Sequence, residues 1–442
     1  MRRPDPHLVL AGAGVLVLAA EAGYDRWVSD AWLLFEAAVA VAALAYAWRE
    51  QDRLRLGPLL AVVLGFDLAL VLLHLGLDIR ADKDSSVVFR WQGNGLLRGD
   101  YPRSEYPAGA VLLFGFEAWI GGGTTRVANA LLMIPFQLVA VAAVWLTRTR
   151  YAAWLAAVVG LWPLNAYYWE FKFDLVPAAL LAAGLVLALR EWWALSGAVL
   201  GLGALAKWTP GLAAVALVVW LLASGRARDA ARHGAAFAAT VLLVYLPLLV
   251  WAPSEVLAAY SRQGGRSITA ESVWYLVLKP FGLARLRSHI SFSAGAPEWA
   301  NVAATAIQAL LVLAIVAATV LVRRNLRAAV ALAALAPVTF LLLNRIFSPQ
   351  FVVVLFAAWA VAASLVVRTR REQLAVGAVA IAAALGNVFV FPFALPHYAV
   401  TWQLASATLF ACGLALTAWL ALRALAARDT GHPGAATGAP GD

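Results

Sequence analysis

The chain alternates between long apolar runs and short arginine clusters, and this alternation decides its fold class. A helix that crosses a bilayer needs about 20 predominantly apolar residues. Twelve runs approach that length, and they cover 8–22, 31–48, 57–77, 127–146, 151–168, 174–189, 234–251, 299–322, 328–343, 349–367, 373–391 and 398–422. The sequence therefore predicts an all-α polytopic membrane protein.

Composition supports this reading and excludes other classes. The 442 residues are 63% hydrophobic and 13% charged, whereas soluble domains carry about a quarter charged residues. The only cysteine, Cys412, lies in an apolar run, which excludes a disulfide framework, a cysteine zinc site and a thioredoxin-type pair. The net charge of +10 comes from arginines between apolar runs, as in membrane topology signals, so no nucleic-acid partner is expected.

Three further runs are ambiguous. Segment 107–123 begins with Pro-Ala-Gly and ends in three glycines, whereas 194–206 and 210–223 are short and separated by a Lys-Trp-Thr-Pro break. Cytoplasmic loops are enriched in Lys and Arg. All arginine clusters face the cytoplasm if 107–123 is re-entrant or juxtamembrane and 194–223 is an out-and-back pair. We therefore expect about 12–14 transmembrane helices, with these clusters inside: Arg49/Arg53/Arg55, Arg148/Arg150, Arg190, Arg226/Arg228/Arg232, Arg323/Arg324/Arg327, Arg368/Arg370/Arg371 and Arg423/Arg428.

The two ends of the chain have compositions of their own. Arg2 and Arg3 precede an apolar run that resembles a signal peptide, although an uncleaved first helix suits a protein with many later spans. The tail after Arg428 is rich in Gly, Pro and Ala, which predicts disorder. We expect one transmembrane domain over 1–427, long outer loops at 78–126 and 252–298, and a disordered cytoplasmic tail over 428–442.

The segment from Asp78 to Ala110 is the first long polar interruption. It holds acidic, basic and aromatic side chains in one loop on the predicted outer face, which suggests chemistry at that face. A solvated, partly disordered loop is the alternative, but apolar and aromatic residues recur throughout the segment. The residues concerned are Asp78, Asp82, Asp84, Glu105, Arg80, Lys83, Arg90, Arg98, Arg103, Trp91, Tyr101 and Tyr106.

Two later segments combine a cation with a predicted helix start on the same face. Lys207 precedes Thr209, which can cap a helix that begins at Pro210. Arg345 similarly precedes Ser348 and Pro349, which can cap and begin the 349–367 helix. Helix N-termini present free N–H groups and partial positive charge, so both are candidate anion sites, with snorkelling cations as the alternative.

Other polar residues have two open interpretations each. Arg262 and Arg266 are spaced i, i+4 and suit a phosphate, or belong to a solvated face. Asp174 begins a helix, where it either interacts with the helix dipole or belongs to the functional site. His397 has either a capping or interface role at the last span or a catalytic role. Within the spans lie Glu36, Asp67 and His74, where charge is costly; Asp67 and His74 are seven residues apart and on one helix face, where each can satisfy the other or a neighbour.

Six segments resemble the GT-C superfamily of integral membrane glycosyltransferases, and most closely the bacterial, polyprenol-phosphate-mannose-dependent group, glycosyltransferase family 87. In chain order they are DSSVVFRW from Asp84, LLRGDYPRSEYPAGA, WPLNAYYWEFKFDLVPAALL, LGLGALAKWTPGL, GGRSITAESVWY and NRIFSPQF. They extend over about 78–357. Two departures are Pro107-Ala108 in place of the family's double proline, and three aspartates in the first loop where the family has one acid.

The resemblance implies a GT-C-like bundle in a bacterial plasma membrane, with its active site on the outer, periplasmic face. It implies inverting transfer of a sugar, with mannose expected, from a polyprenyl-phosphate donor to a lipid or glycan acceptor. Asp84 is then the general base. Lys207, Arg345, Arg266 and Arg262 bind the donor phosphate, and the acceptor pocket comprises Trp91, Glu105, Tyr106, Asp174, Asn344, Gln350 and His397.

A transporter or flippase of a lipid-linked sugar is the rival function, because broken helices and buried charges also occur there. A transporter needs a pathway that opens to both faces, whereas the polar candidates here are predicted on one. No cofactor is expected; nothing in the sequence indicates a divalent metal, although the sequence does not exclude one. The expected partners are the donor, the acceptor and the bilayer.

Overall fold

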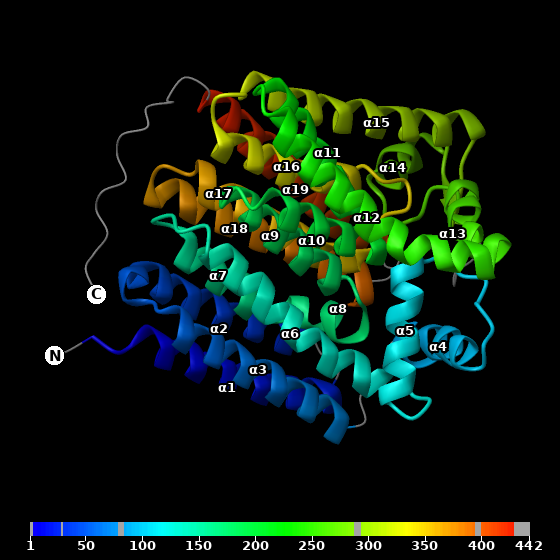
Figure 1. The fold of residues 1–442 in the computed structure, drawn as a ribbon. Coiled ribbons are helices and arrows are strands. Elements are labelled where there is room, and N and C mark those ends of the chain that lie inside the picture. Colours follow the sequence, from blue (N-terminus) through cyan, green and yellow to red (C-terminus); the bar gives the residue numbers. More distant parts are fainter. Residues whose placement is uncertain (1–2, 28–29, 78–83, 287–292, 394–398, 428–442) are drawn as a thin grey trace.

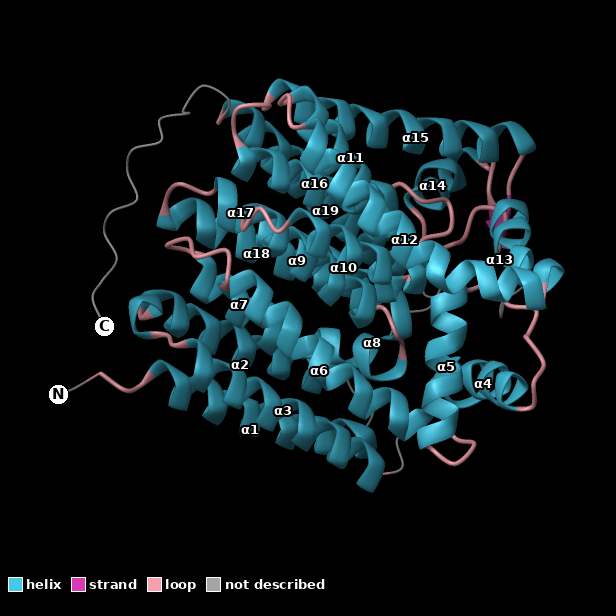
Figure 2. Cartoon of the chain, in the orientation of Figure 1, coloured by secondary structure: helices cyan, strands magenta, loops and turns pink. Residues whose placement is uncertain are grey.

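The computed structural model describes residues 3–427 apart from 28–29, 78–83, 287–292 and 394–398. The described chain is almost entirely helical, with one small two-stranded sheet (Figures 1 and 2). Twelve α-helices occupy the predicted apolar runs. They are α1 Pro6–Trp27, α2 Asp30–Arg49, α3 Leu56–Gly76, α6 Arg126–Trp145, α7 Ala152–Leu161, α9 Leu175–Leu189, α12 Ala227–Trp251, α15 Glu298–Leu321, α16 Leu326–Leu342, α17 Val352–Val366, α18 Arg370–Val388 and α19 Ala399–Ala426.

The remaining elements are shorter and connect or flank these helices. They are α4 Phe89–Leu97, α5 Ala108–Ile120, α8 Ala166–Phe171, α10 Trp193–Ala206, α11 Thr209–Ala223, α13 Pro253–Gly265, α14 Val273–Leu278, β1 Arg285–Leu286 and β2 Ala294–Gly295. Short 3-10 or π turns cover Gln51–Arg53, Asp84–Val88, Pro163–Asn165, Lys279–Phe281, Pro349–Phe351 and Phe389–Phe393.

Among the described residues, eight helices are long and apolar enough to cross a membrane, and five apolar helices of 10–17 residues accompany them. The protein is therefore an all-α, multi-pass membrane protein, as predicted. The count of 12–14 spans stays a prediction. The run predicted over 151–168 is broken, because α7 ends at Leu161 and Pro163 starts a separate turn that leads into α8.

Burial separates central helices from peripheral ones, although both kinds are equally apolar. In the span that includes α17, 89% of the residues are buried inside the protein, whereas in α12 only 6% are. Most residues of α9, α16 and α17 are buried, whereas most of α12 and α15 is not, and Figure 1 shows α15 along the upper edge of the molecule. The exposed leucines and valines of α12 therefore face the lipid.

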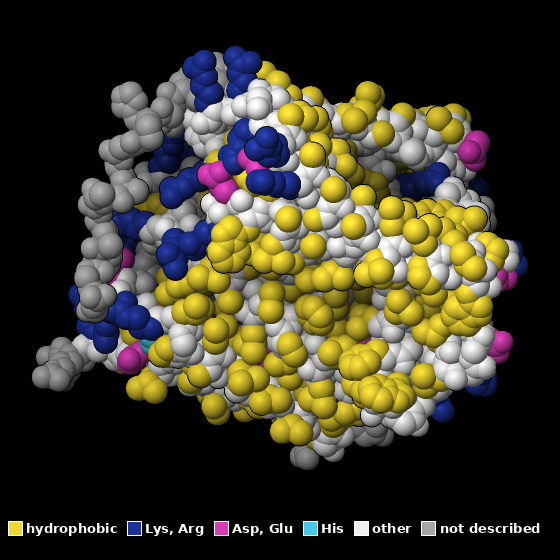
Figure 3. Space-filling view, viewed as in Figure 1, with side chains coloured by type: hydrophobic (Ala, Val, Ile, Leu, Met, Phe, Trp, Pro, Cys, Tyr) yellow, Lys and Arg dark blue, Asp and Glu magenta, His cyan; other side chains and the backbone are white. Residues whose placement is uncertain are grey.

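The predicted cytoplasmic clusters gather at one end of the molecule. Loops around residues 48–53, 146–151, 190–192, 224–232, 322–327 and 368–373 form this arginine-rich end, and they contact one another. Arg190 donates to the Leu146 carbonyl at 3.0 Å, and Arg226 pairs with Glu191 at 2.6 Å. Figure 3 shows Lys and Arg concentrated at the left end, next to a broad hydrophobic band.

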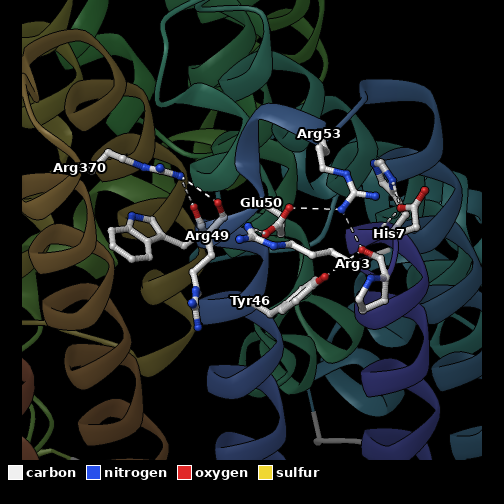
Figure 4. Close-up of polar contacts among 10 residues, drawn as sticks. Arg3, His7, Tyr46, Arg49, Glu50, Arg53 and Arg370 are labelled. Atoms are coloured by element: carbon white, nitrogen blue, oxygen red, sulfur yellow. Dashed lines mark hydrogen bonds and ion pairs between the residues drawn. The ribbon is translucent and has the colours of Figure 1, made fainter. Parts of the chain in front are cut away.

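The N-terminus is tied into this end by polar contacts (Figure 4). Arg3 pairs with Glu50 at 2.8 Å, and Arg53 pairs with the same carboxylate at 3.2 Å. Arg370 at the start of α18 donates to the carbonyls of Trp48 and Arg49 at 2.8 and 3.2 Å. These contacts fix the mutual positions of α1, α2 and α18 at the end opposite α4, α5 and α13.

Candidate functional site

A cavity of about 780 Å³ lies at the end opposite the arginine-rich loops. Its walls come from the π turn before α4, the segment before α5, the α8–α9 and α10–α11 junctions, α13 with the loop after it, and the segment between α16 and α17. Small-molecule sites usually have volumes of about 300–1,000 Å³, so this cavity has the capacity of a ligand site. Residues far apart in the sequence meet there.

Most of the residues predicted for the site line this cavity. Members of both the catalytic and the binding sets are included, although they come from five separate segments. These are Asp84, Glu105, Tyr106, Lys207, Arg266, Asn344, Arg345 and Gln350.

Three ion pairs organise the charged residues in and behind the cavity wall. Lys172 Nζ lies 2.5 Å from Asp84 Oδ2, and Arg266 Nη1 lies 3.1 Å from Glu105 Oε2. Lys207 donates to Asp174, which is fully buried at the start of α9. Each of these cations therefore has a carboxylate partner, which compensates the cost of placing it in a partly buried wall.

Aromatic rings hold Lys207 in place. Its ammonium lies 3.9 Å from the centroid of the Phe351 ring and 5.6 Å from that of Phe173, distances at which a cation is attracted to the ring face. Lys207 sits where α10 ends and α11 begins. The break in the helix therefore presents a fixed cation to the cavity.

Arg345 is held differently. Its Nη2 donates to the Gly264 carbonyl at 2.5 Å, so a backbone oxygen rather than a carboxylate accepts its hydrogen bond. A backbone carbonyl leaves the guanidinium charge unneutralised. Arg345 is therefore well suited to receive an anion in the cavity.

Tyr106 places a phenol beside the acids. Burial raises the pKa of Tyr106, and the neighbouring carboxylates of Asp84, Glu105 and Asp174 raise it further. The hydroxyl is therefore protonated at neutral pH and can donate a hydrogen bond. The ring packs edge-on against Phe89 and Phe173, with centroid distances of 6.0 and 5.4 Å, which fixes its orientation.

Other predicted site residues lie elsewhere. Trp91 is on α4, 56% exposed, and does not line the cavity. Arg262 donates to the Arg103 carbonyl at 2.7 Å outside the cavity wall, and Asp174 lies behind Lys207. His397, together with Asp78 and Asp82, is outside the described residues.

The predicted helix caps are wrong in detail. Thr209 lies inside the first turn of α11, and its hydroxyl has no partner within the described chain. Ser348 occupies a cap position, but its hydroxyl donates to Gln350, and a 3-10 turn precedes α17. Of the two alternatives for His74, the structure shows a neighbouring partner, because its Nδ1 lies 2.5 Å from Glu170 Oε2, whereas Asp67 has no hydrogen-bond partner in the described chain. The cations thus approach the cavity next to helix starts without side-chain caps.

The cavity lining also includes a cation and two exposed aromatic residues that were not assigned to the site from the sequence. Lys172 pairs with the predicted base, and Trp208 and Tyr260 stack with ring centroids 4.9 Å apart and an interplanar angle of 7°. Of the large aromatic side chains exposed in the described chain, these two line the cavity. Lys172 lies two residues before Asp174 in a polar interruption of the sequence, which is a local signal, whereas nothing local marks Tyr260 on α13.

The described residues include no group of three or more His, Cys, Asp or Glu side chains arranged to hold a metal ion. The cavity instead offers a carboxylate, several fixed cations, a phenol and stacked aromatic rings. That set can take a proton, hold an anion and contact a sugar ring.

Comparison with family models, with curated proteins and with solved structures finds no match to this chain.

Proposed function

We propose that this protein is a membrane glycosyltransferase of GT-C type that transfers a sugar, with mannose expected, from a polyprenyl-phosphate donor to a lipid or glycan acceptor at the outer face of a bacterial plasma membrane. The single observation that supports it is the cavity that combines Asp84 with Lys172, Lys207 and Arg345. An acid that can act as a base and cations that can receive a leaving phosphate are the two requirements of such a transfer.

The reaction follows from these groups. Asp84 takes the proton of the acceptor hydroxyl as its oxygen attacks the anomeric carbon from the side opposite the phosphate. The bond between that carbon and the phosphate oxygen breaks, and its electron pair leaves with the polyprenyl phosphate. Lys207 and Arg345 stabilise the growing phosphate charge. The sugar configuration is inverted, and the proton resides on Asp84.

Lys172 links the two parts of this reaction, the proton transfer to Asp84 and the departure of the phosphate. Its ammonium lies 2.5 Å from Asp84 Oδ2, in a cavity wall that also carries Lys207 and Arg345. Charge that develops on the leaving phosphate competes for the same ammonium. Transfer of the ammonium to the phosphate would free the Asp84 oxygen to accept the proton of the acceptor hydroxyl.

A transporter receives less support. The residues that line the cavity come from one end of the molecule, and the polar residues of the opposite end that Figure 4 shows contact one another instead of the cavity. An alternating pathway needs a site accessible from both faces.

The direct test uses purified protein in lipid vesicles with radiolabelled polyprenyl-phosphate mannose and a bacterial glycolipid extract as acceptor. Label should move to the glycolipid without any nucleotide sugar. Strict dependence on a nucleotide sugar would overturn the donor, and movement of the labelled lipid between leaflets without transfer would favour the flippase.

A further inference from the structure

A second group of titratable side chains lies behind the cavity, inside the helix bundle. It comprises Glu21 on α1, Glu36 on α2, Asp67 and His74 on α3, and Glu170 on α8, and we refer to it as the acid–histidine cluster. Exposed fractions are 2% for Glu36, 1% for Asp67, 5% for His74 and 2% for Glu170. None of these residues lines the cavity, so the proposed transfer does not use them.

The cluster is connected rather than scattered. His74 Nδ1 lies 2.5 Å from Glu170 Oε2, and His74 Nε2 lies 3.7 Å from Glu21 Oε2. Glu36, which is 2% exposed, lies close enough to Glu21 for the two acids to interact. The imidazole thus stands between two acids, one of which contacts a third.

Elementary chemistry requires bound protons here. Two neighbouring carboxyl groups inside the protein cannot both be ionised without a large cost, so one of them retains a proton. Asp67 is an independent case: both of its oxygens lack a hydrogen-bond partner in the described chain, and it lies close enough to Glu170 to interact electrostatically. A buried carboxylate without a partner is too costly, so Asp67 is a neutral acid.

The remaining charges then balance. With one proton shared by Glu21 and Glu36 and another on Asp67, negative charge remains on the glutamate pair and on Glu170. The imidazolium of His74 and the guanidinium of Arg126 on α6, which acts on Glu170, supply the matching positive charges. Loss of either bound proton leaves an uncompensated negative charge in a medium of low dielectric constant.

The cluster is also linked to the cavity through three consecutive residues. The Phe171 ring stacks on His74 at 6.1 Å, and Asn129 Nδ2 donates to the carbonyls of Glu170 and Lys172 at 2.7 and 3.2 Å. Lys172 in turn contacts Asp84. A change of charge at Glu170 therefore acts on the backbone that carries Lys172.

We propose that the acid–histidine cluster is an intramembrane proton-binding site that holds two exchangeable protons at neutral pH, and that its protonation sets the position of the 170–172 segment. The ligand is the proton itself. The first part concerns the cluster alone and does not depend on the proposed transferase function.

Infrared spectroscopy of the intact protein in nanodiscs tests the binding. Protonated carboxylic acids absorb apart from carboxylates, and their bands shift in D2O. At pH 7 the wild-type protein should show such bands, and Asp67→Asn and Glu36→Gln should each remove one. Glu117→Gln is the matched control: Glu117 is fully buried, has no hydrogen-bond partner among the described residues and lies outside the cluster, so the variant should lose only the band of Glu117.

Wild-type protein alone keeps the proposal falsifiable if a variant does not fold. Titration from pH 5 to pH 9 should show protonated acids that persist at pH 7. Absence of any protonated carboxyl at pH 7, or bands unchanged in Asp67→Asn and Glu36→Gln, overturns the proton-binding site.

Hydrogen exchange tests the link to the cavity. His74→Gln removes the imidazolium, and amides of residues 168–174 should then exchange about 10-fold faster or more, as expected for loss of a charged hydrogen bond. His233→Gln provides the control, because His233 is a buried histidine on α12 whose Nδ1 contacts only the Trp193 carbonyl in the described chain. Equal exchange of residues 168–174 in His74→Gln and wild type overturns the link.

Discussion

The two ends of the molecule both hold many charged side chains but use them differently. At the arginine-rich end, the cations are exposed: the Arg3 side chain is 74% exposed and that of Arg226 is 31% exposed. At the cavity end, the side chains of Lys172 and Lys207 line the cavity and are 8% and 19% exposed, whereas that of Arg266 at the same cavity is 39% exposed. Ion pairs alone therefore do not identify a site; burial next to a cavity does.

The largest expected difference between the two ends is their position on opposite sides of the membrane, which cysteine labelling can test. Ser254 at the start of α13 and Arg228 on α12 are both exposed. In a Cys412→Ala background on intact cells, an impermeant thiol reagent should label Ser254→Cys and leave Arg228→Cys unlabelled. A cysteine in the first outer loop at Ser104 would be a poor probe, because Ser104 is buried and its hydroxyl donates a hydrogen bond to Gln92. Labelling of Arg228→Cys alone would reverse the orientation.

The next largest contrast concerns stability. Lys207→Met removes the partner of Asp174, whose side chain is fully buried, and an unpaired buried charge costs about 3–5 kcal/mol. The double variant Lys207→Met/Asp174→Asn should recover most of the loss. Denaturant unfolding in detergent measures both, and equal stability of the single variant and wild type would contradict the buried pair.

The next largest difference is expected in enzymatic turnover, which should depend on an acid at the cavity end and not on one at the arginine-rich end. Asp84→Asn keeps shape but loses the proton acceptor, and we expect turnover to fall about 100-fold or more with donor binding retained. Glu191→Gln, which removes an acid of the arginine-rich end, is the control and should leave turnover unchanged. If Asp84→Asn is active while Asp78→Asn or Asp82→Asn is inactive, another acid of the first loop is the base.

Anion binding gives a smaller effect. Arg345→Ala should weaken binding of polyprenyl phosphate by about 1.5–3 kcal/mol, the value of a charged hydrogen bond. Lys279→Ala is a suitable control, because Lys279 is a cation outside the cavity that packs near Tyr275. Titration calorimetry with polyprenyl monophosphate measures both, and identical affinities would assign Arg345 a structural role.

The smallest effect is expected at the arginine-rich end itself. Glu191→Gln breaks the ion pair with Arg226. The Glu191 side chain is 53% exposed and the Arg226 side chain is 31% exposed. Pairs of this kind contribute about 1 kcal/mol or less. Unfolding of this variant should nearly superimpose on that of wild type; a loss as large as that of Lys207→Met would remove the distinction between the ends.

The sequence was sufficient for the helices and for the grouping of the arginines, because both depend on local hydropathy and charge. It also predicted a break at Lys207, since Thr-Pro after a lysine interrupts an apolar run. The sequence could not predict the pairing of Lys172 with Asp84, because that contact joins residues 88 positions apart. The caps failed for a related reason: the hydroxyl of Ser348 has a competing acceptor in Gln350.

Two contacts beside the cavity have a consequence for which substitutions are tolerated. Arg262 and Gln263 of α13 donate to the carbonyl oxygens of Arg103 and Glu105. Those acceptors belong to the main chain and persist whatever side chain follows. Substitutions at residue 103 therefore leave its carbonyl acceptor in place, whereas substitutions at residues 262 and 263 remove the side-chain donors. A survey of tolerated substitutions would consequently identify the α13 residues of this contact and miss the segment that accepts their hydrogen bonds.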